Sequence, residues 1–551
     1  MNNFYKKLVL FGGLLIPLLI FLNRFLLPDL SFDSVNYHVF FGDRFSNFWK
    51  FSSFEFFPTG LHSFPPVFDY FGGIFRQFFG YRLGSIVSLV FLYGIIYLLT
   101  KIIGLYSKKK IWSEYALVLF FINIFISLEI FFQLGTYYVD IIGAFWVIWS
   151  IYLMLLYFKH DDRKMLIGSG VLIGFSVAGK LTNLIYLIPM VLLIGFLELR
   201  KSCLVRKKIN NLLLFGFFIF LPIGISCVGN FIKTGNPVFP FYNAIFKSKY
   251  YSTVSFNNTN FGGRNFLEKL IWPIVSVNIP ERLSEGHDLF NDYKLNLYFI
   301  LLLPSLFFSY RRREKDILFW YFNVFYFLSM MLWNFSFGYL RYAMVLEMLG
   351  GLMVYFWVDR LIHKKNIFKV KNFSLLIVLL IVLAVFGYLD KKAININLAY
   401  DLSWRKTFTY NRSVYLGEAK NLFINKLSVM ELSNNNFPDV FLNCSAPGLA
   451  FYSLSQFNML PVVNIDNRAS REMTSNTFYN NEVNRRIFKK SGKNTISFVT
   501  IVGRDGLTNQ YVSCIETLRD RKFIINEEIP VDDFLGYGDQ KLMYIFGEYS
   551  L

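Results

Sequence analysis

Charged residues are scarce in this sequence. Only 17% of its 551 residues are charged, whereas 54% are hydrophobic, and phenylalanine alone occurs 66 times. Soluble domains rarely carry so little charge, so the composition indicates a membrane protein that crosses the bilayer several times. Four cysteines in a chain of this length do not indicate a disulfide scaffold.

Signature motifs of soluble enzymes are also missing. The C-terminal part, residues 390–551, contains no GxGxxG, P-loop, HExxH or GxSxG motif. Short apolar runs alternate there with a helical pattern at Gln510–Arg521, which predicts a small α/β domain. The runs lie at 440–443, 459–465, 495–502 and 542–549. We expect this domain to hold an acceptor or cap an active site rather than to catalyse a reaction.

Long apolar runs are abundant. A helix needs about 20 apolar residues to cross a bilayer, and eleven segments meet or approach that length. These candidate spans are 8–27, 83–103, 112–133, 138–158, 164–181, 183–198, 211–229, 294–309, 317–335, 342–358 and 373–389. The short pair 164–181 and 183–198 could instead form a hairpin that enters and leaves on one side. Phe266–Ile279 is shorter still, which predicts a surface helix.

Basic residues orient the chain. If the N-terminus is cytoplasmic, every short Lys/Arg cluster falls on that side. The net charge of +19 is then mostly a topology signal, and no nucleic-acid partner is expected. The prediction is a polytopic α-helical membrane domain over 1–389, with long outer loops at 28–82 and 230–293, and an extracytoplasmic domain over 390–551. Abundant Phe, Asn, Lys and Ile are typical of an AT-rich bacterial genome, so we expect a bacterial cytoplasmic membrane.

The first outer loop carries two helical stripes of apolar residues. One follows Asp33 and includes Tyr37 and Phe41, and the other begins at Val67 after a pair of prolines. Both stripes predict amphipathic helices that lie flat on the outer leaflet.

Four charged residues at the outer ends of spans are candidates for chemistry. Asp33 either caps a helix or acts as a general base, and the two roles are compatible. Asp140 either caps the next helix or is a second acidic residue of a site. Lys180 and Arg341 either anchor their helices at the interface or bind an anionic lipid phosphate.

His38 and His62 are the candidates for metal ligands. Two distant histidines are weak grounds for a metal site, and the outer loops contain no DxD or ExD pair for a divalent cation. We therefore expect metal-independent chemistry without a cofactor.

The order of these motifs resembles the GT-C superfamily of membrane glycosyltransferases, which includes protein O-mannosyltransferases and the aminoarabinose transferase of lipid A. The resemblance covers about residues 1–390. It rests on Asp33 with Tyr37-His38, the PTGLHSFPP stretch that contains His62, the YYVD turn ending at Asp140, GKLTN with Lys180, and GYLRY with Arg341. No Asp-Glu pair occurs at position 33 and no WWDYG motif occurs, so no subfamily is indicated.

The resemblance implies transfer of a sugar from a polyprenyl-phosphate or polyprenyl-diphosphate donor to a glycan, lipid or protein acceptor on the outer face. Asp33 would deprotonate the acceptor, with Asp140 as a second acidic residue. Lys180 and Arg341 would face the donor phosphate. Tyr37, His38 and His62 would help to bind substrate.

Two other functions compete with this one. A flippase would need charges inside its spans to pass a polar headgroup, whereas the middle stretches of the predicted spans are almost uncharged and polar residues collect on one side. A polymerase or ligase of polyprenyl-linked glycans should have arginines in its large outer loops, and Arg264 and Arg282 meet that requirement. The sequence therefore favours the transferase over the flippase and leaves the polymerase open.

Overall fold

The computed structural model describes the chain in separate segments. These are residues 14–22, 33–34, 38–43, 67–106, 127–200, 204–249, 253, 260–283, 293–311, 317–363, 440–443, 462–464, 495–503, 518–519, 524–531 and 542–550. The predicted span 373–389, most of the span 112–133, and the candidate residues Tyr37 and His62 lie outside them.

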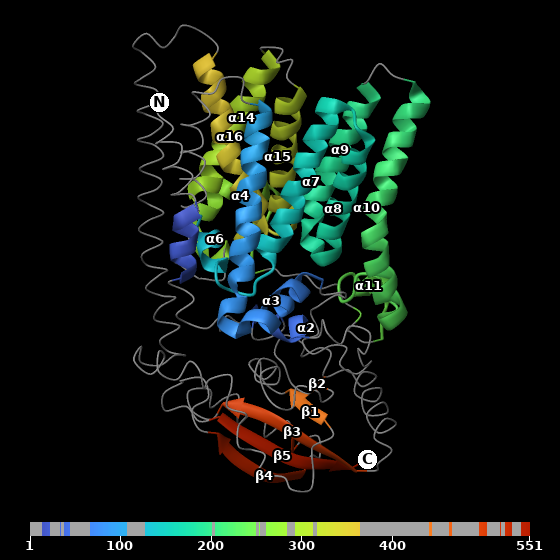
Figure 1. Cartoon of the computed structure of the whole chain (residues 1–551), viewed down its shortest axis with the longest axis vertical. Coiled ribbons are helices and arrows are strands. Elements are labelled where there is room, and N and C mark those ends of the chain that lie inside the picture. The colour runs from blue at the N-terminus through green and yellow to red at the C-terminus, as the bar shows by residue number, and fades with distance from the viewer. Residues whose placement is uncertain are drawn as a thin grey trace.

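Eight long helices of the described segments form a bundle with roughly parallel axes (Figure 1). They are α4 (Ile86–Tyr106), α7 (Asp140–His160), α8 (Arg163–Gly179), α9 (Leu184–Arg200), α10 (Val205–Thr234), α14 (Tyr293–Arg311), α15 (Ile317–Ser336) and α16 (Met344–His363). Each overlaps a predicted span, and the bounds agree to within three residues except at both ends of α10 and the C-terminal end of α16, which extend five or six residues farther. Four segments of the described chain are long and apolar enough by themselves to cross a membrane: Ile86–Leu105, Asp140–His160, Leu181–Arg200 and Val205–Ile232. The protein is a polytopic helical membrane protein, and eleven spans remain a prediction.

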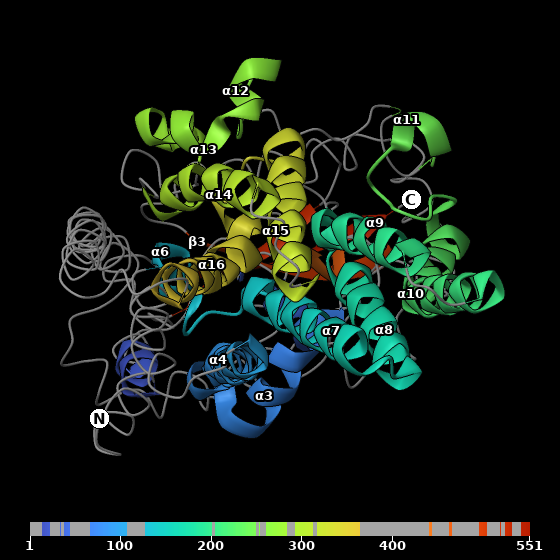
Figure 2. The same ribbon diagram turned by 90° about the horizontal axis from the view of Figure 1, so that it is seen from above.

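The short helices α8 and α9 are full members of the bundle. Helix α8 packs between α7 and α10, and α9 packs against α15 (Figure 2). Glycines permit the close approach of α8 to α10. A Cβ atom at Gly170 would lie 3.1 Å from the Phe215 carbonyl oxygen, and one at Gly174 would lie 2.3 Å from that of Ile219. Small residues at such positions let the backbones of membrane helices come close together.

One end of the bundle is covered by the segments that the sequence assigns to the first outer loop. Helix α2 (Val39–Asp43) crosses α3 (Val67–Gly84) where Gly42 meets Gly73, since a Cβ atom on Gly73 would clash with the Gly42 backbone. The second predicted stripe is confirmed as α3, which kinks at Gly80, where φ is 77°. Of the first stripe, the structure describes only α2 and a few flanking residues.

The segment between α10 and α14, which the sequence assigns to the outer side, is built from short pieces where it is described. They are α11 (Asn243–Phe246), α12 (Phe266–Leu270), α13 (Trp272–Val275), η4 (Ser276–Asn278) and η5 (Pro280–Arg282). The prediction of one surface helix over Phe266–Ile279 is wrong, because the helix breaks at Ile271, whose φ and ψ are −113° and 24°, and Pro273 begins a new turn. A proline inside a continuous helix would remove a backbone hydrogen bond and clash with the preceding turn.

The C-terminal part contains a five-stranded sheet in the order β2-β1-β3-β5-β4. Its strands are β1 (Val440–Asn443), β2 (Val462–Asn464), β3 (Thr495–Gly503), β4 (Ile524–Val531) and β5 (Leu542–Ser550). Strand β1 pairs in parallel with β2 and β3, and β5 pairs antiparallel with β3 and β4. Four strands match predicted apolar runs, and the sheet lies beyond the end of the bundle that carries α2 and α3 (Figure 1).

Strand β4 was not predicted. Its sequence IINEEIPV places two glutamates and a proline in the strand, so the alternation of apolar and polar residues is lost. The structure shows an irregular register between Ile525 and Glu527 in its pairing with β5. Of the predicted helix Gln510–Arg521, only residues 518–519 are described, and the predicted domain boundary after residue 389 also lies outside the described segments.

The contact between α8 and α10 generates a stability prediction. Gly174→Ala should lower the free energy of unfolding by about 1–3 kcal/mol, because the added methyl group forces the two backbones apart. Thermal unfolding in detergent micelles measures the effect. Gly216→Ala on α10 is the control, since a Cβ atom there has no neighbour within 4 Å. Equal melting temperatures for the two variants would contradict the tight contact.

Candidate active site

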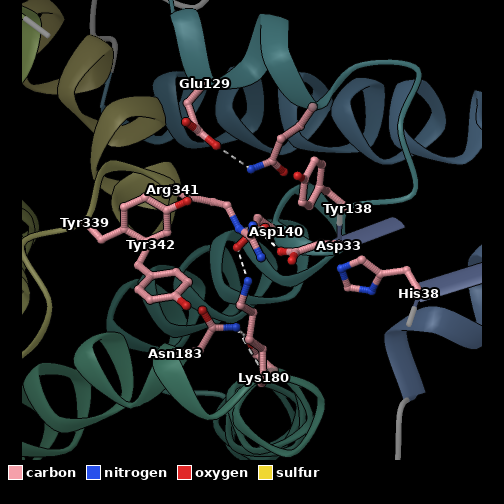
Figure 3. A network of polar contacts seen from close by, with 12 residues as sticks. Asp33, His38, Glu129, Tyr138, Asp140, Lys180, Asn183, Tyr339, Arg341 and Tyr342 are labelled. Atoms are coloured by element: carbon pink, nitrogen blue, oxygen red, sulfur yellow. Dashed lines mark hydrogen bonds and ion pairs between the residues drawn. The ribbon is translucent and has the colours of Figure 1, made fainter. Parts of the chain in front are cut away.

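Four predicted charged residues come together at the end of the bundle that carries α3 (Figure 3). Asp140 is the first residue of α7, and Lys180 lies between α8 and the short helix η3 (Leu181–Asn183). Arg341 belongs to η7 (Leu340–Ala343), which precedes α16. Asp33, 308 positions before Arg341 in the sequence, contacts it directly. These four residues are called the charge cluster below.

The charge cluster is held by ion pairs. Arg341 donates from Nη1 to Oδ2 of Asp33 at 2.5 Å, and its Nε lies 3.0 Å from Oδ2 of Asp140. Lys180 Nζ donates to Oδ1 of Asp140. The four side chains are at most 15% exposed. Two carboxylates therefore balance two cations, which is how buried charges are tolerated.

Asp140 does not cap its helix. The N-cap position of α7 is Val139, and the carboxylate of Asp140 is directed to Lys180 and Arg341 instead. The capping interpretation of Asp140 is therefore wrong, and its role in a site stays a prediction. Burial lowers the pKa of the Lys180 ammonium group, and the Asp140 carboxylate opposes this shift because it favours the charged form.

An aromatic ring packs against each of the two cations. The Tyr138 ring centroid lies 4.5 Å from Cζ of Arg341, and the Tyr342 ring centroid lies 5.0 Å from Nζ of Lys180. Cations over ring faces at these distances are attracted by the ring quadrupole. Tyr186 on α9 donates from its hydroxyl to the Tyr342 carbonyl at 2.7 Å. The rings thus pack against the two cationic groups, while the carboxylates accept hydrogen bonds from their N–H groups.

Backbone contacts hold the segment that carries Arg341. Trp333 Nε1 on α15 donates to the Tyr339 carbonyl at 2.8 Å, and the Leu340 N–H donates to the Leu283 carbonyl at 2.8 Å. The turn that carries Lys180 is held by Asn183, whose Nδ2 donates to Oγ of Ser176 at 2.7 Å. Both cations therefore sit on short, anchored turns at the ends of long helices.

His38 contacts a residue that the sequence analysis did not identify. Its Nδ1 forms a close contact with Oδ1 of Asp69 on α3, and its ring lies edge-on to Tyr138, with centroids 5.9 Å apart. Burial raises the pKa of Asp69, and the interaction with His38 opposes that shift. The signal for Asp69 was present, because an aspartate interrupts the apolar stripe VFDYF.

A second set of buried polar residues was also missed. Gln133 on α6 (Leu128–Gln133) donates from Nε2 to Oε1 of Glu129 at 2.8 Å. Ser127 donates to Glu347 on α16, and Lys294 Nζ lies 3.7 Å from Oε2 of Glu347. The sequence signal for this set was the presence of charged residues within apolar runs, as in SLEIFF and MVLEML.

Metal binding has no support among the described residues. In those segments, no group of three or more His, Cys, Asp or Glu side chains is placed to hold a metal ion. Metal-independent chemistry remains a prediction, since His62 lies in the part of the chain that is not described.

Comparison with known families identifies the enzyme class. Residues 63–225, which include Asp69, Asp140 and Lys180, match the family model described as dolichyl-phosphate-mannose-protein mannosyltransferase. The chain is a membrane glycosyltransferase of the GT-C type. No curated protein sequence matches it.

Solved structures show which fold this glycosyltransferase has. The crystal structure of ArnT from Cupriavidus metallidurans bound to undecaprenyl phosphate aligns with a TM-score of 0.53 and 13% identity, over 99% of this chain and 98% of that one. The same protein in the apo state gives 0.49 at 13% identity over 97% of both chains. The oligosaccharyltransferase of Archaeoglobus fulgidus gives 0.47 at 16% identity, over 96% of this chain and 73% of that one. Only the first score supports a shared fold.

The ion pairs of the charge cluster generate a prediction for the stability of the glycosyltransferase. Arg341→Gln should lower the free energy of unfolding by about 3–5 kcal/mol, because two buried carboxylates lose a partner. Adding Asp33→Asn to Arg341→Gln should cost less than the sum of the single changes, by about 0.5–3 kcal/mol. Denaturant unfolding in micelles measures all three variants. Strictly additive effects would show that the Asp33–Arg341 contact carries no coupling.

Proposed function

We propose that this glycosyltransferase moves a sugar from a polyprenyl-phosphate donor to an acceptor hydroxyl on the outer face of a bacterial cytoplasmic membrane. The charge cluster carries the proposal: two carboxylates and two cations are held together at the end of an apolar bundle, where a lipid headgroup would lie. The ArnT structure with undecaprenyl phosphate supports a lipid-phosphate donor, because that protein shares the fold.

Asp33 is the proposed general base. Its pairing with Arg341 favours the ionised carboxylate, which is the form that accepts a proton. The acceptor oxygen attacks the anomeric carbon of the donor sugar, the bond between that carbon and the phosphate oxygen breaks, and the lipid phosphate leaves with the electron pair. The acceptor proton passes to Asp33. A positioned base of this kind contributes about 10²–10⁴ in rate.

Lys180 and Arg341 are the proposed partners of the donor phosphate. Both are cations held by carboxylates and rings in a site from which water is largely excluded, so their charges act strongly on a departing phosphate. Arg341 also contacts Asp33, and it would therefore link donor binding to the base. Asp140 positions both cations, because it contacts each of them.

The polymerase or ligase alternative stays open. One of its two candidate arginines, Arg282, donates to the Gly262 carbonyl and to Oε2 of Glu268 at 3.2 Å, and it stacks over Trp272 at 5.2 Å. The Arg264 N–H and Arg282 hold the pKa of Glu268 below its usual value. Arg282 is thus engaged in holding the outer segment together.

Loss of the base tests the reaction. Purified protein is incubated with radiolabelled polyprenyl-phosphate sugars and a membrane extract, and the labelled fraction names the acceptor. Asp33→Asn should lower the transfer rate by about 10²–10⁴ while insertion into the membrane is unchanged. Asp161→Asn, an exposed aspartate paired with Lys207 near the opposite end of the bundle, is the control and should keep full activity. Full activity of Asp33→Asn would remove it from the role of base.

Donor titration tests the phosphate site. Lys180→Ala should raise the apparent KM for the lipid-linked donor, because a phosphate partner is lost, whereas Lys180→Arg should retain most donor binding, because it keeps the charge. Initial rates at varied donor concentrations measure both variants. An unchanged dependence on donor concentration in Lys180→Ala would indicate that Lys180 only anchors its helix at the interface.

A further inference from the structure

An uncharged apolar surface lies on the outside of α12 and α13. It is formed by Phe266, Leu267, Leu270, Ile271 and Ile274, whose side chains are between 39% and 70% exposed. These positions recur at the spacing that places residues on one side of a helix, and the break at Ile271 does not interrupt the series. A contiguous exposed surface of this kind marks a contact with lipid or with another protein. These five residues are called the apolar face below.

The apolar face lies at the boundary of the helical bundle. The Phe266 ring contacts the Phe335 ring at the end of α15, with centroids 5.5 Å apart, and α13 packs against α14. The sequence predicts α14 and α15 as spans, and Phe335 is the last residue of the predicted span 317–335. Figure 2 shows α12 at the edge of the bundle, away from the strands of the C-terminal sheet. This position favours lipid of the adjoining leaflet as the occupant of the face.

The acidic residue of α12 points away from the apolar face. Glu268 accepts from the Arg264 N–H at 2.8 Å and from Arg282 at 3.2 Å, and Arg282 in turn packs over Trp272. The carboxylate is therefore paired within the protein. Immersion of the apolar face in lipid does not require an unpaired carboxylate to enter the membrane, which would be costly.

The buried side of α12 and α13 is bonded to the turn that carries Arg341. Trp272 is fully buried, and its Nε1 donates to the Gly338 carbonyl at 2.7 Å. Phe261, which precedes α12, stacks on Tyr339 with ring centroids 4.3 Å apart. Gly338 and Tyr339 come immediately before η7, so contacts made by the α12–α13 segment hold the backbone that leads into Arg341.

Two glycines allow this close packing. Gly262 and Gly338 have φ angles of 79° and 59°, in the left-handed region that favours glycine. A Cβ atom on Gly338 would lie 2.4 Å from Cα of Gly262 and 2.8 Å from Nε1 of Trp272. Because the two backbones touch with no flexible side chain between them, a displacement of one segment displaces the other.

We propose that the apolar face is embedded in the leaflet at this end of the bundle, and that α12 and α13 use this anchorage to hold Arg341 in position for the donor phosphate. The lipid contact follows from the place and chemistry of the face. The effect on the donor rests on the proposed function, in which Arg341 faces the phosphate. Trp272 is in this account a positioning residue, because it acts on the donor only through the turn that carries Arg341.

Spin-label accessibility tests the lipid contact. The full chain, with its four cysteines replaced by serine, receives Leu267→Cys, a nitroxide label and reconstitution into vesicles of phosphatidylcholine and phosphatidylglycerol. Oxygen, which concentrates in lipid, should relax this label more strongly than a water-soluble nickel chelate does. Ile524→Cys, an exposed apolar position on β4, is the control and should show the reverse order.

Donor kinetics test the connection to Arg341. Trp272→Phe removes the hydrogen bond to Gly338 but keeps an aromatic ring in the packing, so it should raise the apparent donor KM by about 3–10-fold with a smaller change in kcat. Leu267→Glu places a charge on the apolar face and should raise the same KM in vesicles. Its effect should be smaller in the Trp272→Phe background, because both changes act through one contact. Ile524→Glu is the matched control and should keep the wild-type KM.

The outcomes separate this inference from the proposed function. A label at position 267 in lipid, together with a raised donor KM in Trp272→Phe, supports it. A label as accessible to nickel as that at position 524, or shielded from both reagents by a protein partner, overturns it. If the label lies in lipid but Trp272→Phe and Leu267→Glu keep the wild-type donor KM while Asp33→Asn is inactive, the connection to Arg341 is overturned and the transferase stands. If the wild type transfers no sugar from any polyprenyl-phosphate donor, the proposed function fails together with the role in donor binding, and the spin label still decides the lipid contact.

Discussion

The ion pairs of Arg341 are the interactions on which the rest of the site depends. Its guanidinium group contacts Asp33 and Asp140 on separate segments, and its flat face lies on Tyr138. A planar group with several fixed donors can bridge two carboxylates, whereas a lysine in the same place would act as a single point of charge. The bundle must therefore place the start of α7, the segment at residue 33 and η7 within reach of one side chain.

The apolar bundle makes these contacts strong. Fully buried aromatic and aliphatic residues fill the space between the helices, including Trp333, Tyr186 and Met190. Because water is largely excluded, each charge in the cluster must be matched by a partner, and the match fixes the positions of all four side chains. The same need for matched charges means that a bound donor would rearrange the ion pairs of the cluster. A donor phosphate would have to compete with the carboxylates for the cations, which would free Asp33 to act as a base.

The segment that carries α2 and α3 brings further polar side chains to the bundle. Helices α2 and α3 lie across the end of the bundle at which the charge cluster is found (Figure 1). Their close crossing at two glycines sets His38 beside Asp69 and near Tyr138. A loop held this rigidly can carry catalytic groups, because its side chains keep fixed positions relative to residues on the long helices.

The sequence by itself determined the membrane class, the approximate positions of the eight described long helices, four of the five described strands and the candidates Asp33, Asp140, Lys180 and Arg341. Apolar length and charge at helix ends are local properties, so they are visible without a structure. Only the tertiary structure decided that Asp33 meets Arg341 across 308 positions, that Asp140 is not a cap, and that His38 pairs with Asp69. Such pairings depend on which helix ends lie together, and packing between distant segments decides that.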